Sequence, residues 1–161
     1  MDTHHAPTHH PTVSGDRQLW SQAVSATLHC LTGCAIGEVL GLVIGTALGL
    51  STVATIVLAV ALAFVFGYAL TITPVLRAGV PLATALGVAF AADTVSITVM
   101  EVVDNAIMLV VPGAMDAGLD SWLFWGALAV ALAVAFVLTV PVNRWLLARG
   151  KGHAVVHEYH H

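Results

Sequence analysis

Residues 52–73 read TVATIVLAVALAFVFGYALTIT, an unbroken stretch of uncharged and mainly apolar side chains. A bilayer core about 30 Å thick requires roughly 20 such residues in an α-helix, at about 1.5 Å per residue. Three more long, mainly apolar stretches occur at about 24–49, 82–111 and 121–147. The sequence therefore predicts an all-α membrane protein, a bundle of four transmembrane helices.

The composition of the whole chain agrees with a lipid environment. Of its 161 residues, 58% are apolar and 9% are charged, whereas soluble domains carry about 25% charged residues. The net charge of −4 offers no basic surface, so we expect the lipid bilayer and not a nucleic acid as partner. Because no nucleophile–base pair, phosphate-binding loop or cofactor motif is recognisable, we do not expect an enzyme.

The basic residues predict the orientation of the chain. Arg17 precedes the first span, and Arg77 lies between the second and third spans. Arg144 lies at the end of the fourth span, and Arg149 and Lys151 follow it. All of them fall on one side of a four-span topology, so the positive-inside rule places both termini in the cytoplasm. The expected organisation is a polar tail, a transmembrane domain and a second tail, at residues 1–22, 23–148 and 149–161.

Glycines recur at a spacing of four along the first span. They would form one stripe on which a neighbouring backbone can approach closely. The partner helix could belong to the same chain or to a second subunit, in a homo-oligomer or a larger membrane complex. These glycines are Gly33, Gly37, Gly41, Gly45 and Gly49.

Polar side chains inside the predicted membrane region are concentrated in the first and third spans, whereas the second and fourth are expected to face lipid. Four acids fall within spans that contain no Lys or Arg: Glu38, Asp93, Glu101 and Asp104. An acid at the helix centre costs on the order of 3 kcal/mol. The four are therefore expected to be protonated, to face a hydrated cavity or to hold a cation. The alternative is that they are neutral hydrogen-bonding groups between helices.

The third-span acids share one helix face with Met100 and Met108, at about 100° per residue. Glu38, Asp93 and Glu101 could converge near the midplane if the first and third helices touch. Separate surroundings for Glu38 and Asp93, with no shared polar pocket, would end the cation-handling interpretation.

His29, Cys30 and Cys34 lie in the cytoplasmic half of the first span, and with Glu38 they form a candidate metal-ligand set. Thiols at i and i+4 lie about 6 Å apart at Cβ, whereas a disulfide needs about 3.8 Å. That spacing suits two ligands of one metal, and thiols with imidazole select copper(I) or zinc(II). Met100 and Met108 could add thioether ligands. Alternatively, the cysteines are small packing residues and His29 is an interfacial polar group.

Eight of the nine histidines lie in the two tails. Short His-rich tracts are compositional signals of metal binding, so the tails could capture an ion. The alternative is a solvated tail with no metal. These residues are His4, His5, His9, His10, His153, His157, His160 and His161.

The run from Leu28 to Glu38 reads LHCLTGCAIGE. It resembles the glycine-rich first helix of an uncharacterised family of small bacterial integral-membrane proteins, a domain of unknown function whose third helix is acidic. The resemblance covers about residues 20–148. It implies a multi-pass protein of a bacterial inner membrane and no assigned activity.

Three functions are compatible with this sequence. The first is binding, and transport or sensing, of a soft metal cation such as copper or zinc at the Cys/His/carboxylate site. The second is a proton or monovalent-cation pathway along the intramembrane carboxylates, with Asp93, Met100, Glu101 and Asp104 in the third span. The third is an accessory subunit that does not transport and that docks through its glycine stripe.

Overall fold

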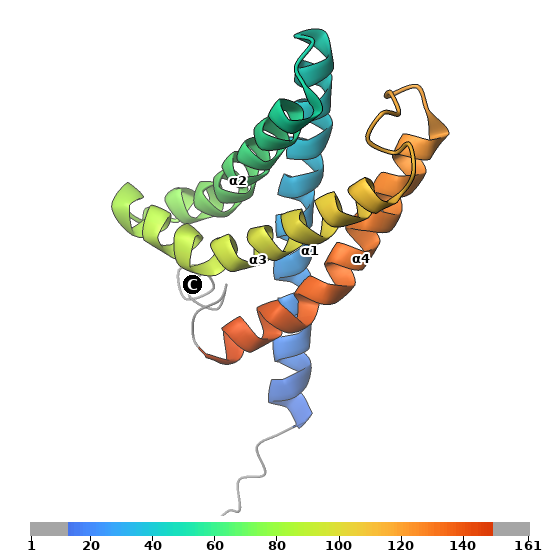
Figure 1. The fold of residues 1–161 in the computed structure, drawn as a ribbon. Helices are drawn as coiled ribbons and strands as arrows, with labels where there is room; N and C mark the ends of the chain where they lie inside the picture. Colours follow the sequence, from blue (N-terminus) through green and yellow to red (C-terminus); the bar gives the residue numbers. More distant parts are fainter. Residues whose placement is uncertain (1–12, 150–161) are drawn as a thin grey trace, which may run out of the picture.

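The computed structural model describes residues 13–149, which form four α-helices joined by short connections (Figure 1). The helices are α1 (Val13–Ala47), α2 (Thr52–Arg77), α3 (Leu82–Val110) and α4 (Trp122–Ala148). Each is long and apolar enough to cross a membrane, and no strand occurs among the described residues. The predicted all-α architecture with four such helices is therefore confirmed.

The first helix begins earlier than expected, at Val13 instead of about residue 24. Part of the segment expected as a polar tail is therefore helical. Asp16 lies in the first turn, where an acid interacts favourably with the helix dipole. Its Oδ1 also accepts from Nη2 of Arg144 in α4, at 2.5 Å, and the Arg144 guanidinium lies over the ring of Trp20. These contacts connect the start of α1 to the last turns of α4.

Local turn chemistry explains where the hairpins form. Ser51 caps α2 by accepting from the backbone N–H of Ala54, and Ser121 caps α4 by accepting from that of Leu123. Gly49 lies beyond the end of α1 with φ at 63°, in the left-handed region that glycine tolerates best. Nothing lies within 4 Å of a Cβ placed there. Gly49 therefore belongs to the turn, and its expected place in the packing stripe is corrected.

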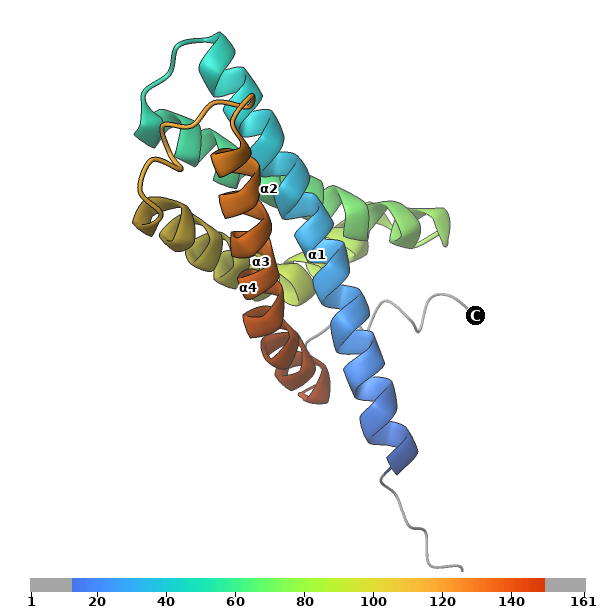
Figure 2. The same ribbon diagram turned by 90° about the vertical axis from the view of Figure 1, so that its right-hand side faces the viewer.

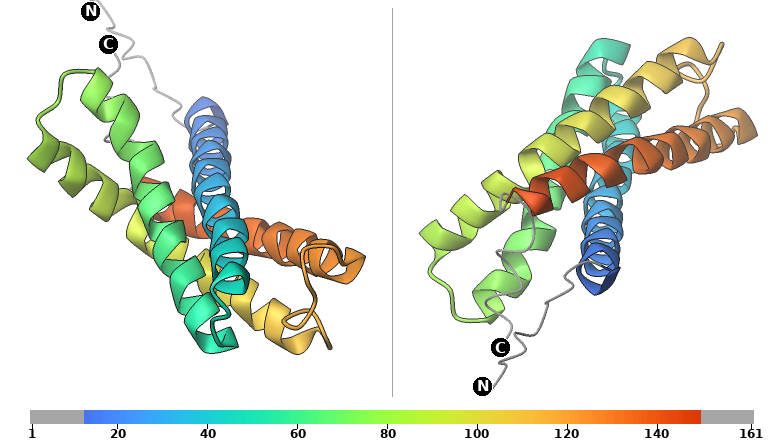
Figure 3. Two further views of the ribbon diagram at one scale, coloured as in Figure 1. Left: turned by 90° about the horizontal axis from the view of Figure 1, so that it is seen from above. Right: turned by 90° about the horizontal axis from the view of Figure 1, so that it is seen from below.

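Two helical hairpins make up the molecule. α1 and α2 lie along one another, and α3 and α4 form the second hairpin, which crosses α1 (Figures 1, 2 and 3). α1 and α3 each contact all three other helices. The α1–α2 turn and the loop between α3 and α4, residues 111–121, lie at the same end of the molecule (Figure 2).

The glycine stripe of α1 packs against α2 of the same chain. A Cβ added at Gly37 would lie 2.2 Å from the backbone nitrogen of Ala63, far inside van der Waals contact. The facing pairs are Gly33 with Gly67, Gly37 with Ala63, Gly41 with Ala59, and Gly45 with Thr55. The packing partner that the sequence left open is therefore α2. Because α2 covers the stripe, it offers no free surface to another protein in this structure.

The fourth helix does not face lipid alone, contrary to expectation. It buries a row of small or polar residues spaced by four: Ala127, Ala131, Ala135, Thr139 and Asn143. Small side chains let this face approach α1 and α3 closely, while large apolar residues such as Val130 and Val137 remain exposed on other faces. The sequence of α4 does not distinguish its buried face from its exposed face, because the alanines of one and the valines of the other are both apolar.

Candidate functional site

Three polar side chains of α1 each form a hydrogen-bonded pair with an acid of α3. The pairs are Cys30 with Asp93, Cys34 with Glu101, and Glu38 with Asp104. The first is a thiol–carboxyl hydrogen bond, with 3.6 Å between Sγ and Oδ1. The three α3 acids are only 0%, 4% and 3% exposed, in the order of the pairs. The interface between α1 and α3 is therefore a polar seam inside an apolar molecule.

The expected convergence of Glu38, Asp93 and Glu101 is not observed. Asp93 lies beside Cys30, eight residues before Glu38 and thus about 12 Å from it along α1. Glu38 and Asp93 therefore occupy separate surroundings, so the cation-handling interpretation that required these two residues to meet is wrong. The reason is the register of the crossing helices, which brings Glu38 to the C-terminal half of α3.

A different group of acids does come together. Glu38 interacts with both Glu101 and Asp104, and the last two also interact with each other. Glu101 also accepts from Asn105, whose Nδ2 lies 3.5 Å from Oε2 and 2.9 Å from the Glu101 carbonyl oxygen. We call Glu38, Glu101 and Asp104 the acidic cluster. Asp104 is buried although it lies only six residues before the end of α3.

An apolar layer separates this cluster from Asp93. Ile97 and Met100 are 0% and 1% exposed and pack in one group with Cys30 and Cys34. Met100, a predicted ion-pathway residue, thus contributes to the apolar layer together with the two thiols. At the middle of the polar seam, thiols and hydrocarbon take the place of carboxyl groups between Asp93 and Glu101.

The candidate metal ligands are not gathered at one point. Cys30 and Cys34 are free, buried thiols, and each lies against a different acid. Glu38 lies with the acidic cluster. Within residues 13–149, no group of three or more His, Cys, Asp or Glu side chains is arranged to hold a metal ion. The histidines of both tails lie outside the described residues: His4, His5, His9, His10, His153, His157, His160 and His161.

His29 has a partner in the backbone of α2. Its imidazole hydrogen-bonds to the backbone of Leu70. Leu70 lies four residues before Pro74, which is inside α2 and has no N–H to bond the Leu70 carbonyl. His29, which was expected as a metal ligand, therefore supplies the Leu70 backbone with the donor that Pro74 lacks.

A second buried polar network was not identified from the sequence. Asn143 of α4 donates through Nδ2 to Oγ1 of Thr27 in α1, at 2.8 Å, and its Oδ1 accepts from the hydroxyl of Ser96 in α3. Thr27 in turn donates to the carbonyl oxygen of Ala23. The signal that could have revealed it is the spacing of Asn143 four residues after Thr139 in the buried row of α4. This network holds three helices together beside Asp93 and Cys30.

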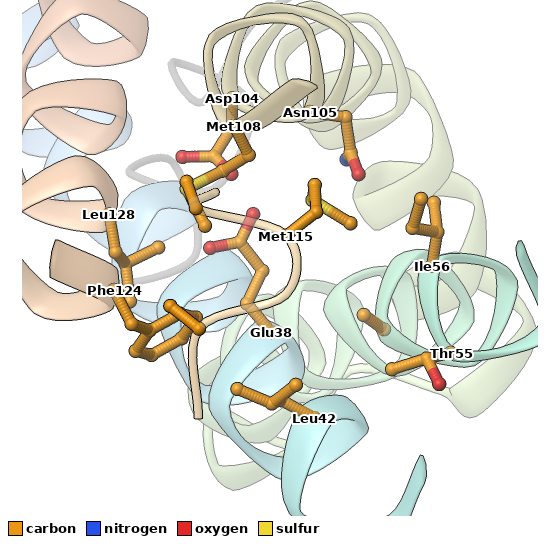
Figure 4. Close-up of a pocket in the computed structure, with 13 residues that line it drawn as sticks. Glu38, Leu42, Thr55, Ile56, Asp104, Asn105, Met108, Met115, Phe124 and Leu128 are labelled. Carbon is orange, nitrogen blue, oxygen red and sulfur yellow. The ribbon is translucent and has the colours of Figure 1, made fainter. Parts of the chain in front are cut away.

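A cavity of about 60 Å³ adjoins the acidic cluster. Figure 4 shows the carboxyl groups of Glu38 and Asp104 facing one another at one wall. The loop between α3 and α4 closes the cavity through Met115. Much of the remaining lining is apolar and includes Leu42, Ile56, Met108, Phe124 and Leu128.

These features define an α-helical protein with four helices able to cross a membrane and with acids buried between two of them. The chain belongs to the family described as Domain of unknown function (DUF4396), whose model matches residues 19–152. The expected resemblance to an uncharacterised domain family is thereby confirmed. Neither a curated protein nor a solved structure matches the chain.

Proposed function

We propose that this protein handles a cation at the acidic cluster, and that the proton is the ion that the arrangement fits best. The observation that carries the proposal is the pairing of Glu38 with Asp104 in the interior of the molecule, where both also interact electrostatically with Glu101. The basic residues of the described chain lie near helix ends, at Arg17, Arg77, Arg144 and Arg149. Adjacent buried acids without a basic partner cannot all be ionised, so they must share protons or hold another cation.

The arrangement of the donor groups favours a proton over a metal ion. A metal ion needs several ligands that converge on one point, and no such group of His, Cys, Asp or Glu occurs in residues 13–149. A proton needs only one carboxyl oxygen at a time and passes between neighbouring groups. Glu38 interacts with both Glu101 and Asp104, as the passage of a proton between neighbouring groups requires.

Transport, as distinct from sensing, requires a change in the apolar layer. Ile97 and Met100 lie between the acidic cluster and Asp93 on α3, and a proton does not cross buried hydrocarbon without water or a polar group. We therefore propose that this structure is a closed state and that Asp93 is the acid on the other side of the barrier.

The membrane setting of the proposal follows from the sequence. We propose that both termini lie in the cytoplasm, which the distribution of basic residues supports, and that the membrane is the inner membrane of a bacterium, as the family resemblance implies. We further propose that the HCxxxCxxxE run of α1, from His29 to Glu38, is shared by the family. The bilayer is the proposed partner, with a homo-oligomer or a larger membrane complex around it, and no enzymatic step is proposed.

A soft metal such as copper or zinc is the second candidate ligand. Cys30 and Cys34 favour it, because the two free thiols pack in one buried group and thiols bind soft metals. His29 and Glu38 would have to move to join them, and the tail histidines would capture the ion. If this candidate is right, replacing both cysteines with serine will abolish metal retention by the purified protein, as measured by elemental analysis.

Proton flux in liposomes tests the main proposal. We expect Glu38→Gln and Glu101→Gln to lower the flux of the reconstituted full chain by about tenfold or more, since each removes one exchangeable proton from the cluster. Asp116→Asn is the matched control, because Asp116 is an exposed acid in the α3–α4 loop. The Cys30→Ser and Cys34→Ser variants should keep their flux. Unaltered flux in Glu38→Gln would exclude the proton pathway.

A further inference from the structure

The cavity beside the acidic cluster contains buried oxygen atoms that lack a donor. Oδ1 of Asp104 and Oε2 of Glu38 are both buried without a hydrogen-bond partner. Asp104 is only 3% exposed, and Figure 4 shows its carboxyl group directed toward that of Glu38 from the neighbouring helix. A buried oxygen atom without a hydrogen-bond donor costs folding free energy. A positively charged donor in the cavity would remove this cost.

The opposite walls have a different chemistry. Leu42, Ile56 and Phe124 present hydrocarbon to the cavity (Figure 4), and none of the residues described as lining it is basic. A hard metal ion prefers six to eight oxygen ligands or a hydrated octahedral shell, which these walls do not supply. An occupant with one cationic end and one apolar end matches both parts of the lining.

The cavity also has a continuation toward the end of the molecule. A second cavity of about 140 Å³ shares Leu42, Thr55 and Met115 with the first and extends to Leu50 in the α1–α2 turn. Met115 belongs to the loop that lies at this same end (Figure 2). A small solute could therefore reach the carboxyl pair from the turn and loop end without crossing the apolar layer of Ile97 and Met100.

The geometry points to a binding site for a short-chain alkylammonium ion at Glu38 and Asp104. The ammonium group donates to the two unsatisfied carboxyl oxygens, and the hydrocarbon chain packs against Leu42 and Phe124. A volume of about 60 Å³ exceeds the ~10–15 Å³ that one water requires, which is consistent with a ligand of a few heavy atoms. This inference rests on the proposed cation handling and adds the chemical class of the cation.

Calorimetric titration of the purified full-length protein with n-butylammonium chloride tests this site, and 1-butanol serves as the neutral probe of matched shape. We expect saturable binding of butylammonium and at least about tenfold weaker binding of butanol, because only the cation can pair with the acids. Asp104→Asn should weaken butylammonium binding about tenfold or more. Asp120→Asn is the matched control and should retain the wild-type affinity, since Asp120 is an exposed loop acid that does not line the cavity.

A second variant keeps the test decisive if Asp104→Asn does not fold. Ala117→Leu leaves both acids in place and fills the cavity from the loop, so it should also weaken binding. Equal affinity in wild type and Asp104→Asn would overturn the site, as would competition by sodium chloride at the same concentration as butylammonium. If butylammonium does not bind but proton flux still depends on Glu38, this inference fails and the proposed function stands. If butylammonium binds but no proton flux is measured, the binding site stands and the proposed proton pathway fails.

Discussion

The imidazole of His29 lies where the backbone of α2 lacks a donor. Pro74 leaves the carbonyl of Leu70 without its helical partner, and His29 of α1 hydrogen-bonds to Leu70. In a membrane interior no water replaces a missing donor, so neighbouring helices supply it. One residue thus explains both why α2 continues through a proline and why a histidine lies in α1.

This role predicts a specific pattern of stability. His29→Ala should lower the free energy of unfolding by about 1 kcal/mol, because the Leu70 carbonyl then lacks a donor. The same change in a Pro74→Ala background should cost less, because an alanine at that position would restore the N–H. Thermal unfolding in detergent, followed by tryptophan fluorescence, measures the four variants of this cycle. An equal cost in both backgrounds would show that His29 and Pro74 are uncoupled.

At the scale of helices, the two hairpins are held by different kinds of contact. α1 and α2 meet through small residues at a spacing of four on both helices, from Gly33 opposite Gly67 to Gly45 opposite Thr55. α1 and α3 meet through polar pairs and a thin apolar layer. The first interface brings backbones together and tolerates no added atom, whereas the second contains side chains able to exchange protons.

Adding a side chain to the close-packed interface between α1 and α2 should therefore strongly destabilise the protein. Gly37→Leu is expected to destabilise the protein by about 3 kcal/mol, because its Cβ would meet the backbone of Ala63. The readout is the midpoint of thermal unfolding together with the size-exclusion profile. Gly126→Leu in α4 is the matched control, since nothing lies within 4 Å of a Cβ there. Equal stability of the two variants would contradict the packing described for α1 and α2.

Across the whole molecule, α2 and α4 each return the chain to the side on which α1 begins. The α1–α2 turn and the α3–α4 loop lie at one end of the molecule (Figure 2), and the turn between α2 and α3 carries Arg77 beside it. From the positive-inside rule we predict that the mouth of the cavity lies on the outer side of the membrane and the Arg77 turn in the cytoplasm.

Labelling with a membrane-impermeant maleimide checks this orientation. Ser51→Cys should react in intact cells, whereas Ala78→Cys should react only after the membrane is permeabilised, because both positions are exposed but lie in opposite turns. The native Cys30 and Cys34 are each 1% exposed and should add little background. Labelling of Ala78→Cys in intact cells would reverse the topology.

Much of this molecule was predictable from residue order. Four apolar stretches predicted four helices, because bilayer thickness sets their length. The small residues of α2 recur at the spacing of the α1 glycines, so even the α1–α2 pairing could have been read from Thr55, Ala59, Ala63 and Gly67. Which buried acids meet could not be read in this way. The register and crossing of α1 and α3 separate Glu38 from Asp93 and join it to Asp104, and the periodicity of a single helix contains no information about where a second helix crosses it.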